Sequence, residues 1–432
     1  MIIDQKPQII VATLGENQLK KPQGLKVAYI MSRFPKLTET FILYEMLAMQ
    51  QQGIQVEVYP LLREHEDVMH LEARQFMDIA HFQPFISLPI LRANLHFLLK
   101  KPLAYLKTLW DVLRTNWGSF NFFTGVIGIF PKSVLFAHQM QTDNVQLIHA
   151  HFASHPAAAG FIIHRLIGIP YSFTAHGSDL HRDRHMLREK VAEAAFVAAI
   201  SEYNKELIVS ECQGKYSEKV NVVHCGVDTD VFQDRADQTP YEKGENLFMI
   251  LCIGTLHEVK GQAYLIEACG LLHEKGINFE CHFIGDGPDK ESLSKLVRDS
   301  GLADKVCFHG RMTRDEIALL LLDADVLTAP SVPTSDGRRE GIPVVLMEAM
   351  GSGVPVIASN LSGIPELVND QLTGLLVPPR DAVALANALE RYIIDPELRH
   401  RLGHAGREKV LSEFNLHKNA TKLVQHFRKE CQ

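Results

Sequence analysis

Cysteine is sparse in this sequence, and no two of its seven cysteines form a CxxC pair. An odd number of scattered cysteines argues against a disulfide framework and against a structural zinc site. We therefore expect a protein of a reducing compartment, the cytoplasm.

The sequence also lacks an excess of positive charge and a long hydrophobic run. Its 44 lysines and arginines stand against 51 acidic residues, so we expect no nucleic-acid partner. The opening MIIDQKPQIIVATLG has no basic segment followed by an apolar one, and no window approaches the roughly 18 apolar residues of a membrane span. We expect a chain that is neither exported nor membrane-spanning.

Short β-rich runs alternate with helical segments in two successive series. With 432 residues, of which 46% are hydrophobic, the chain is long enough for two cores of about 200 residues each. The candidate strands are LKVAYIM, IQVEVYP, VQLIHAH, PYSFTAH, AFVAAIS and VNVVHCG, then NLFMILCIG, FECHFIG, KVCFHG, VLTAPS, VPVIAS and GLLVPP. This alternation is typical of doubly wound parallel sheets. We predict an α/β fold of two Rossmann-like domains facing a central cleft, with the ligand beyond the carboxyl ends of the strands.

The domain boundaries follow from composition. Residues 1–21 are polar and without a clear period, and we predict a flexible lead-in there. The charged stretch QDRADQTPYEKGEN, at 233–246, interrupts the alternation and is typical of a linker. We place an N-terminal domain at 22–235, a C-terminal domain at 247–415 and a final helix at 416–432.

The stretch from 85 to 140 departs from the alternation. It mixes Phe, Leu and Trp with Lys and Arg and predicts basic amphipathic helices. Such helices suit a membrane interface, with cations toward anionic lipid. They equally suit packing on the N-terminal sheet with a solvated basic face. Both interpretations stay open, and the first places a peripheral membrane contact at residues 88–130, on the cytoplasmic face.

Two glutamates frame the segment SDGRREGIPVVLMEAMGSGVPVIAS. Glu340 lies just ahead of a predicted helix, Pro343 fits its first turn, and Glu348 lies about two turns in. The free amides from Gly341 to Val344 would point out between them, and such amides bind anions. A nucleotide sugar offers a diphosphate to the amides and hydroxyls to the carboxylates. The simpler alternative, a cap and a solvated residue, leaves a costly carboxylate within the apolar run VVLMEAM.

Several segments between about residues 25 and 415 resemble one enzyme family. They are SRFPKLTETFI, HAHFA, TAHGSDL, AISEYN, HCGVD, IGDGP and DGRREGIPVVLMEAM. The sequence resembles glycosyltransferase family 4, of the retaining GT-B type, and is most similar to its exopolysaccharide and colanic-acid biosynthesis members. The resemblance implies a UDP-, GDP- or ADP-hexose donor, a glycan or lipid-linked oligosaccharide acceptor, and no cofactor or metal. It also implies that the N-terminal domain is the acceptor side, that the C-terminal domain binds the nucleotide sugar, and that the final helix crosses back to the N-terminal domain.

Individual residues take roles from this resemblance. Glu348 resembles the acceptor of ribose hydroxyl bonds, and Glu340 resembles the residue that orients the donor sugar. Lys260, in GTLHEVKG, resembles the lysine that neutralises the diphosphate, a role suited to an ammonium. His176, in TAHG, resembles the histidine that faces the sugar across the cleft, and with Glu340 forms the predicted catalytic set. The predicted donor-binding residues are Gly254, Lys260, Gly285, Gly287, Gly341, Ile342, Pro343, Val344 and Glu348.

One position departs from the family pattern. Thr255 follows the glycine of GTLHEVKG, where the family usually has arginine, so half of the usual basic clamp is missing. Arg338 or Arg339 would supply the missing charge, or both are solvated loop residues. The departure bears on donor affinity rather than on the fold.

Three further motifs have simple explanations. IGDGP contains only GxG, which favours a turn at a strand end over a dinucleotide fingerprint. Asp228 and Asp230 form a DxD near the end of the first domain, where capping and turn roles are favoured. His149 and His151 share one strand face without an obvious third ligand or carboxylate, so we predict no metal there.

Two rival functions remain open at this point. One is a sugar-nucleotide epimerase or phosphorylase on the same architecture, because a fold does not fix a chemistry. The other is a catalytically silent GT-B module that binds glycan or scaffolds a membrane assembly.

Overall fold

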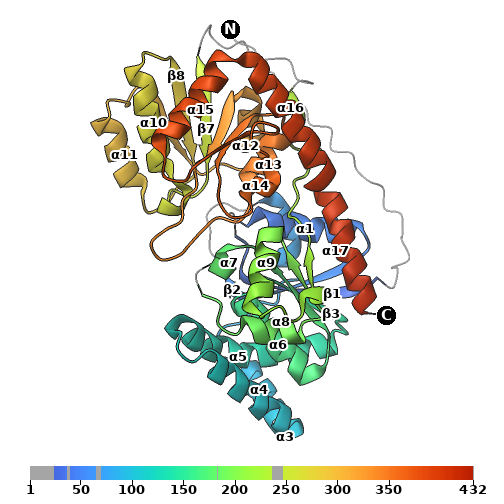
Figure 1. Ribbon diagram of the computed structural model, residues 1–432. Helices are drawn as coiled ribbons and strands as arrows, with labels where there is room; N and C mark the ends of the chain where they lie inside the picture. Colours follow the sequence, from blue (N-terminus) through green and yellow to red (C-terminus); the bar gives the residue numbers. More distant parts are fainter. Residues whose placement is uncertain (1–23, 37–38, 65–69, 182, 236–246, 432) are drawn as a thin grey trace, which may run out of the picture.

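The computed structural model describes residues 24–431 except 37–38, 65–69, 182 and 236–246. The predicted lead-in at 1–21 and most of the predicted linker lie outside the described residues. The rest forms two α/β domains, each built on a six-stranded parallel sheet (Figure 1). The predicted fold class is confirmed.

The N-terminal sheet has the strand order β2-β1-β3-β4-β5-β6. Its strands are β1 (Lys26–Phe34), β2 (Gln55–Arg63), β3 (Leu147–His151), β4 (Tyr171–Ala175), β5 (Phe196–Ala199) and β6 (Val220–Val222). The helices of this domain are α1 (Thr40–Gln51), α2 (Arg74–Met77), α3 (Leu88–Lys100), α4 (Pro102–Thr115), α5 (Phe120–Thr142), α6 (His155–Ile167), α7 (Ser178–His181), α8 (Leu187–Glu193) and α9 (Glu202–Glu211). Strands β3, β4 and β5 are buried along their whole length, as expected of a parallel sheet covered on both faces.

The C-terminal sheet has the order β12-β11-β10-β7-β8-β9. Its strands are β7 (Phe248–Ile253), β8 (Phe279–Ile284), β9 (Val306–Gly310), β10 (Val326–Ala329), β11 (Val356–Ser359) and β12 (Leu375–Val377). The helices are α10 (Gln262–Glu274), α11 (Lys290–Asp299), α12 (Arg314–Asp323), α13 (Val344–Gly351), α14 (Ile364–Leu367), α15 (Ala382–Ile394), α16 (Pro396–Glu413) and α17 (Leu416–Glu430). In both sheets the chain order changes direction at the first strand, which leaves a crevice at the strands' carboxyl ends.

The last helix, α17, returns to the N-terminal domain, as predicted. Helix α16 begins at Pro396, where the ring fits the first turn, and runs along the C-terminal domain. After it, α17 lies along the N-terminal sheet beside α1 (Figure 1). Its apolar side, including Leu423 and Phe427, is buried in the same core as Val27 and Tyr29 of β1. The two domains are therefore joined by a second, apolar connection.

Residues 85–140 form α3, α4 and α5, and the packing interpretation holds for their inner faces. Phe97, Val112 and Phe130 are buried in the N-terminal core. The expectation that no segment approaches the length and apolar composition of a membrane span was wrong. Helix α5, with 23 residues, meets both criteria. However, 56% of the most apolar part of α5 is buried inside the protein. The core helix of a folded domain can have the same length and composition.

Candidate active site

A cleft of about 640 Å³ lies between the two domains, within the usual size range of small-molecule sites. Its walls come from the carboxyl ends of strands in both sheets. Phe152, His176 and Ile200 follow β3, β4 and β5 of the N-terminal sheet. Gly254 and Gly285 follow β7 and β8 on the other side. The cleft is therefore where the doubly wound topology of each domain places a ligand.

The structure brings nearly all of the predicted site residues to this cleft. Those that line it are His176, Gly254, Lys260, Gly285, Arg338, Arg339, Glu340, Gly341, Ile342, Pro343, Val344 and Glu348. The exception is Gly287, which does not line the cleft. A Cβ atom at Gly287 would lie 2.3 Å from the carbonyl oxygen of Leu256, so this glycine allows two loops to pack closely. The roles assigned to all of these residues stay predictions.

Lys260 and Glu340 contact each other in the cleft. The Lys260 Nζ atom lies 3.0 Å from the Glu340 Oε2 atom, and both side chains are partly exposed. The lysine side chain passes over Gly254, where an added Cβ would lie 3.2 Å from Lys260 Cε. Glycine at the end of β7 therefore lets the ammonium approach the floor of the cleft. Because the pair faces the cleft, an arriving anion would compete with the carboxylate for the ammonium.

Helix α13 begins one residue later than the sequence pattern predicts. Pro343, expected within the first turn, has φ −62° and ψ 126° and is the N-cap residue. The amides of Val344 and Val345, in the first turn, have no acceptor within the helix, and both residues line the cleft. The positive end of the helix therefore faces the cleft, as the anion-binding prediction requires.

Glu348 is buried on the cleft side of α13, with 7% of its surface exposed. Burial raises the pKa of its carboxyl to about 7, and the charge of Arg314 only partly offsets this. A buried carboxylate is costly without donors. Ribose hydroxyls would supply such donors, which fits the role that the family resemblance assigns to Glu348.

His176 stands at the end of a buried chain of hydrogen bonds. Its Nε2 atom lies 3.0 Å from His151 Nδ1, and His151 Nε2 lies 3.2 Å from Glu45 Oε1. The Tyr29 hydroxyl donates to the same Glu45 oxygen at 3.0 Å. Burial, and then the neighbouring His151, hold the pKa of His176 well below its ordinary value. An uncharged ring held by Glu45 and His151 can therefore orient a sugar hydroxyl without adding positive charge.

Glu45 is the carboxylate that the sequence pattern did not reveal beside the HAH motif. Ligand atoms of Glu45, His149 and His151 lie within 4.8 Å of one another. However, His149 Nδ1 contacts Ser172 Oγ at 2.8 Å, and Nε2 contacts Thr174 Oγ1 at 2.9 Å. These protein hydrogen bonds satisfy the ring without a metal ion. The expectation of a metal-independent enzyme stays a prediction.

Comparison with known proteins assigns the chain to a family. The family described as Glycosyltransferase Family 4 matches residues 38–231, and Glycosyl transferases group 1 matches residues 233–409. WcaL of Salmonella typhimurium, named as a colanic acid biosynthesis glycosyltransferase, is 31% identical over 90% of this chain and 96% of its own length. The chain belongs to glycosyltransferase family 4. It is therefore a nucleotide-sugar-dependent, retaining glycosyltransferase.

A further relative and two solved structures are also similar to this chain. The amylovoran biosynthesis glycosyltransferase AmsK of Erwinia amylovora is 36% identical over 56% of this chain, an alignment that spans 60% of AmsK. A glycosyltransferase of Rickettsia africae has a TM-score of 0.70 at 18% identity, covering 95% of this chain and 100% of its own. HepE of Anabaena, solved with UDP-glucose, has a TM-score of 0.68 at 17% identity, covering 94% of this chain and 100% of its own. The solved structures establish the GT-B fold.

Thr255, which stands where the family resemblance implies an arginine, lines the cleft. Arg338 contacts His257 Nε2 at 3.2 Å and forms an ion pair with Asp336 at 3.0 Å, so its charge is partly engaged. Arg339, the other predicted substitute, also lines the cleft and is exposed. Both arginines stay candidates for the missing charge.

Sequence reasoning missed two cleft arginines, Arg311 and Arg314. The Arg314 guanidinium stacks on the Tyr44 ring of the other domain at 3.8 Å and lies 3.8 Å from Asp228. The backbone amide of Asp230 donates to Asp228 Oδ1 at 3.0 Å, so the DxD motif forms a turn, as expected. The sequence feature that could have revealed Arg311 and Arg314 is the segment RMTR directly after β9.

Glu348→Gln is expected to stabilise the donor-free enzyme above neutral pH. The folded carboxyl has a pKa of about 7, raised from 4.5, so ionisation costs stability increasingly as pH rises through this interval. The full cost is about 3 kcal/mol, and glutamine removes it. The melting temperature of the variant should exceed that of the wild type at about pH 8 and match it near pH 4.5. Equal melting temperatures at both pH values would contradict the raised pKa of this buried carboxyl.

Proposed function

We propose that this enzyme transfers a hexose from a nucleoside diphosphate sugar to a glycan or lipid-linked oligosaccharide during exopolysaccharide synthesis. The names of WcaL and AmsK, which refer to colanic acid and amylovoran biosynthesis, support this class of product. The observation that carries the proposal is the placement of Lys260, Glu340 and the start of α13 around one cleft. A cation and helix amides suit a diphosphate, and flanking carboxylates suit hydroxyls.

The proposed mechanism stabilises a separation of charge. As the bond from the anomeric carbon to the diphosphate breaks, negative charge collects on the leaving oxygen and positive charge on the sugar ring. Lys260 and the amides of Val344 and Val345 offer fixed positive potential, and such preorganised donors stabilise a transition state by several kcal/mol. The acceptor hydroxyl then bonds to the anomeric carbon on the face that the diphosphate leaves. Its proton passes to the departing phosphate oxygen, which completes a retaining transfer.

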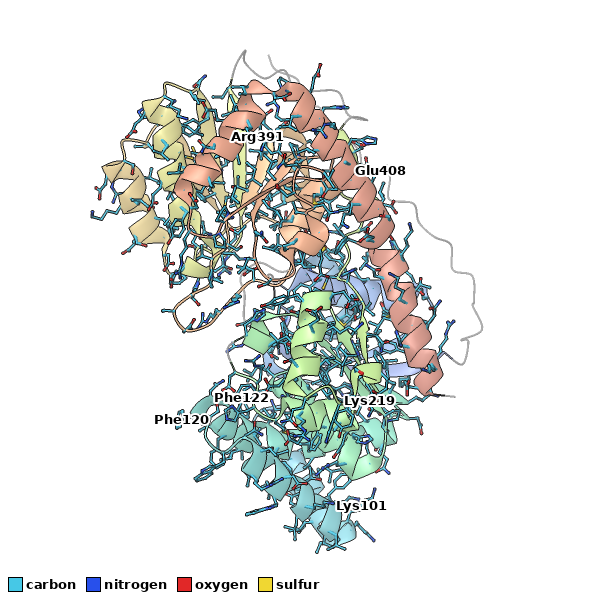
Figure 2. The ribbon with its side chains drawn as sticks, in the orientation of Figure 1. Lys101, Phe120, Phe122, Lys219, Arg391 and Glu408 are labelled. Atoms are coloured by element: carbon cyan, nitrogen blue, oxygen red, sulfur yellow. The ribbon has the colours of Figure 1, made fainter. Side chains whose placement is uncertain are left out.

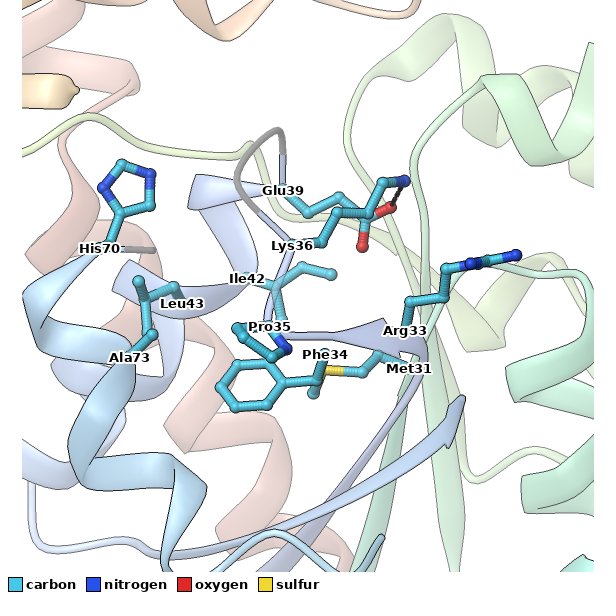
Figure 3. Close-up of a pocket in the computed structure, with 10 residues that line it drawn as sticks. All are labelled: Met31, Arg33, Phe34, Pro35, Lys36, Glu39, Ile42, Leu43, His70 and Ala73. Atoms are coloured by element: carbon cyan, nitrogen blue, oxygen red, sulfur yellow. Dashed lines mark hydrogen bonds and ion pairs between the residues drawn. The ribbon is translucent and has the colours of Figure 1, made fainter. Parts of the chain in front are cut away.

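The acceptor is proposed to enter along the N-terminal wall of the cleft. Lys36, Glu39 and His70 line both the cleft and a neighbouring cavity of about 20 Å³ at the end of β1 (Figure 3). The Lys36 ammonium contacts Glu39 at 2.5 Å. These polar groups offer hydrogen-bond donors and acceptors to a carbohydrate opposite the donor-binding wall.

We place the reaction in the cytoplasm, which is supported by seven cysteines that form no disulfide.

Ligand screening followed by product analysis tests the proposed function. Thermal shifts with UDP, GDP and ADP and their sugars should identify one nucleotide, since a ligand of the native state raises apparent stability. A radiolabelled sugar of that nucleotide should then enter a glycosidic product only when an acceptor is present. Sugar interconversion without an acceptor would favour an epimerase. Phosphate-dependent release of a sugar phosphate would favour a phosphorylase, and binding without turnover would favour a silent module.

A further inference from the structure

The outer side of helices α3 and α4 and the start of α5 exposes a concentration of large apolar side chains. Thirteen of the eighteen such side chains in the described residues lie between positions 85 and 127. They are Phe85, Ile86, Leu88, Leu91, Leu95, Leu98, Leu99, Leu103, Leu106, Trp110, Trp117, Phe120 and Ile127. We call this set the outer helical face. Exposed apolar side chains concentrated in one region in this way mark an interaction site, unlike single scattered ones.

The spacing shows that the outer helical face is separate from the face used for folding. In α4, Leu103, Leu106 and Trp110 recur at intervals of three and four residues and are exposed. Thr108 and Val112, on the opposite side of the same helix, are buried. The helix thus has one apolar stripe for the protein core and a second that the described part of the chain leaves uncovered.

Positive charge accompanies these apolar side chains. Residues 88–130 contain five lysines and arginines and a single acidic residue, Asp111, although the whole chain carries a net charge of −7. Asp111 is already bound to Arg165 at 2.5 Å. The exposed cations Arg92, Lys100, Lys107 and Arg114 have no ion-pair partner among the described residues. Such a face is complementary to anionic lipid headgroups, with the tryptophans at headgroup depth.

The position of the outer helical face leaves the cleft accessible. Helices α3 and α4 lie at the end of the N-terminal domain remote from the C-terminal domain (Figure 1). Lys101 lies at this end, and Phe120 lies at the side of the same domain (Figure 2). A flat partner could therefore contact the face without separating the two domains.

Helix α5 is held in the protein too firmly for insertion across a bilayer. Val126, Phe130 and Val134 are buried in the N-terminal core. The buried Lys132 ammonium donates to the carbonyl oxygen of Leu61 at 2.6 Å, which fixes α5 to the end of β2. The exposed large apolar side chains of α5, Phe120 and Ile127, both lie in the first half of the helix, which is the part free to meet lipid.

We propose that the outer helical face docks this enzyme on an anionic membrane surface, with α3 and α4 lying in the headgroup region and the cleft in water. This inference goes beyond the proposed function, because it requires no particular donor, acceptor or reaction. Burial of the apolar side chains in the lipid interface contributes binding free energy, and the cations favour anionic over zwitterionic lipid.

Sedimentation of the full-length protein with lipid vesicles tests the docking. We expect binding to vesicles of equimolar phosphatidylcholine and phosphatidylglycerol, and much weaker binding to phosphatidylcholine alone. Reversing two charges, in Lys100→Glu/Lys107→Glu, should lower the partition coefficient at least ~25-fold, since each cation near such a surface contributes about fivefold. Trp110→Ser/Phe120→Ser should lower it at least ~10-fold through lost apolar burial.

Matched substitutions on the C-terminal domain control for nonspecific effects. Ile394→Ser/Leu372→Ser removes two apolar side chains of similar exposure, and Lys290→Glu/Lys295→Glu reverses two exposed charges on α11. Both should partition like the wild type, and all variants should keep the wild-type melting temperature and nucleotide binding. Wild-type protein that stays in the supernatant would overturn the proposal. So would a dimer in solution that Trp110→Ser/Phe120→Ser separates, because a second copy would then cover this face.

Discussion

Lys260→Ala is expected to lower kcat/KM for sugar transfer at least ~100-fold, equivalent to about 3 kcal/mol of transition-state stabilisation. The Lys260 ammonium is held over Gly254 on the floor of the cleft, 3.0 Å from Glu340 and on the same wall as the start of α13. Thr255 stands where the family resemblance implies an arginine, so we expect this ammonium to carry a larger part of the charge that faces the leaving diphosphate. Steady-state kinetics with the nucleotide sugar found by screening would measure the loss.

A second lysine distinguishes a catalytic effect from a structural one. Lys275 forms an ion pair with Glu390 at 2.5 Å outside the cleft, so Lys275→Ala breaks a comparable pair away from the donor. Partly exposed pairs contribute about 1 kcal/mol or less to stability, so neither variant should melt much below the wild type. Glu340→Ala should also lose about 100-fold in transfer, because it removes the carboxylate that orients the sugar. Transfer by Lys260→Ala at the rate of Lys275→Ala would refute the assigned role.

The twelve strands could be predicted from sequence because parallel strands covered on both faces form continuous apolar runs. VQLIHAH is an example: its strand, β3, is buried at every position, and turn-forming residues bound such runs elsewhere. The segment from Glu340 to Glu348 was similarly informative, because its chemistry lies within one stretch of chain. Features that lie within one stretch of sequence could therefore be predicted without knowledge of long-range contacts.

Contacts between distant segments were beyond this kind of inference. Glu45 meets His151 across 106 positions, and Arg314 stacks on Tyr44 of the other domain. No motif links either residue to its partner, and only the folded chain brings the two partners together. Helix α5 shows a second limit of sequence inference. Its length and composition are those of a membrane-spanning helix, but in the structure it packs as a core helix. Composition alone does not indicate which side of a helix packs against the rest of the protein.

Gly341→Ala is expected to lower kcat for transfer ~100-fold while nucleotide affinity changes less than about threefold. Gly341 lies where the two domains touch: an added Cβ would stand 2.5 Å from the backbone carbonyl oxygen of His176. Real Cβ atoms do not approach a carbonyl so closely, so the N-terminal wall must move away from the donor-binding wall. Displacement of a catalytic wall by about 1 Å can cost 100-fold in rate, and an open cleft also admits water. The donor-binding groups Lys260 and Glu348 lie on the C-terminal side and are left in place.

Kinetics, nucleotide titration and solution scattering together separate closure from binding. The matched control is Gly270→Ala in α10, where an added Cβ meets no atom within 4 Å and transfer should equal that of the wild type. With donor present, Gly341→Ala should retain a larger radius of gyration than either the wild type or the control. Wild-type kcat in Gly341→Ala would mean that chemistry does not require this contact between the domains. A loss of nucleotide affinity equal to the loss of kcat would instead place the defect in the donor site, against the closure argument.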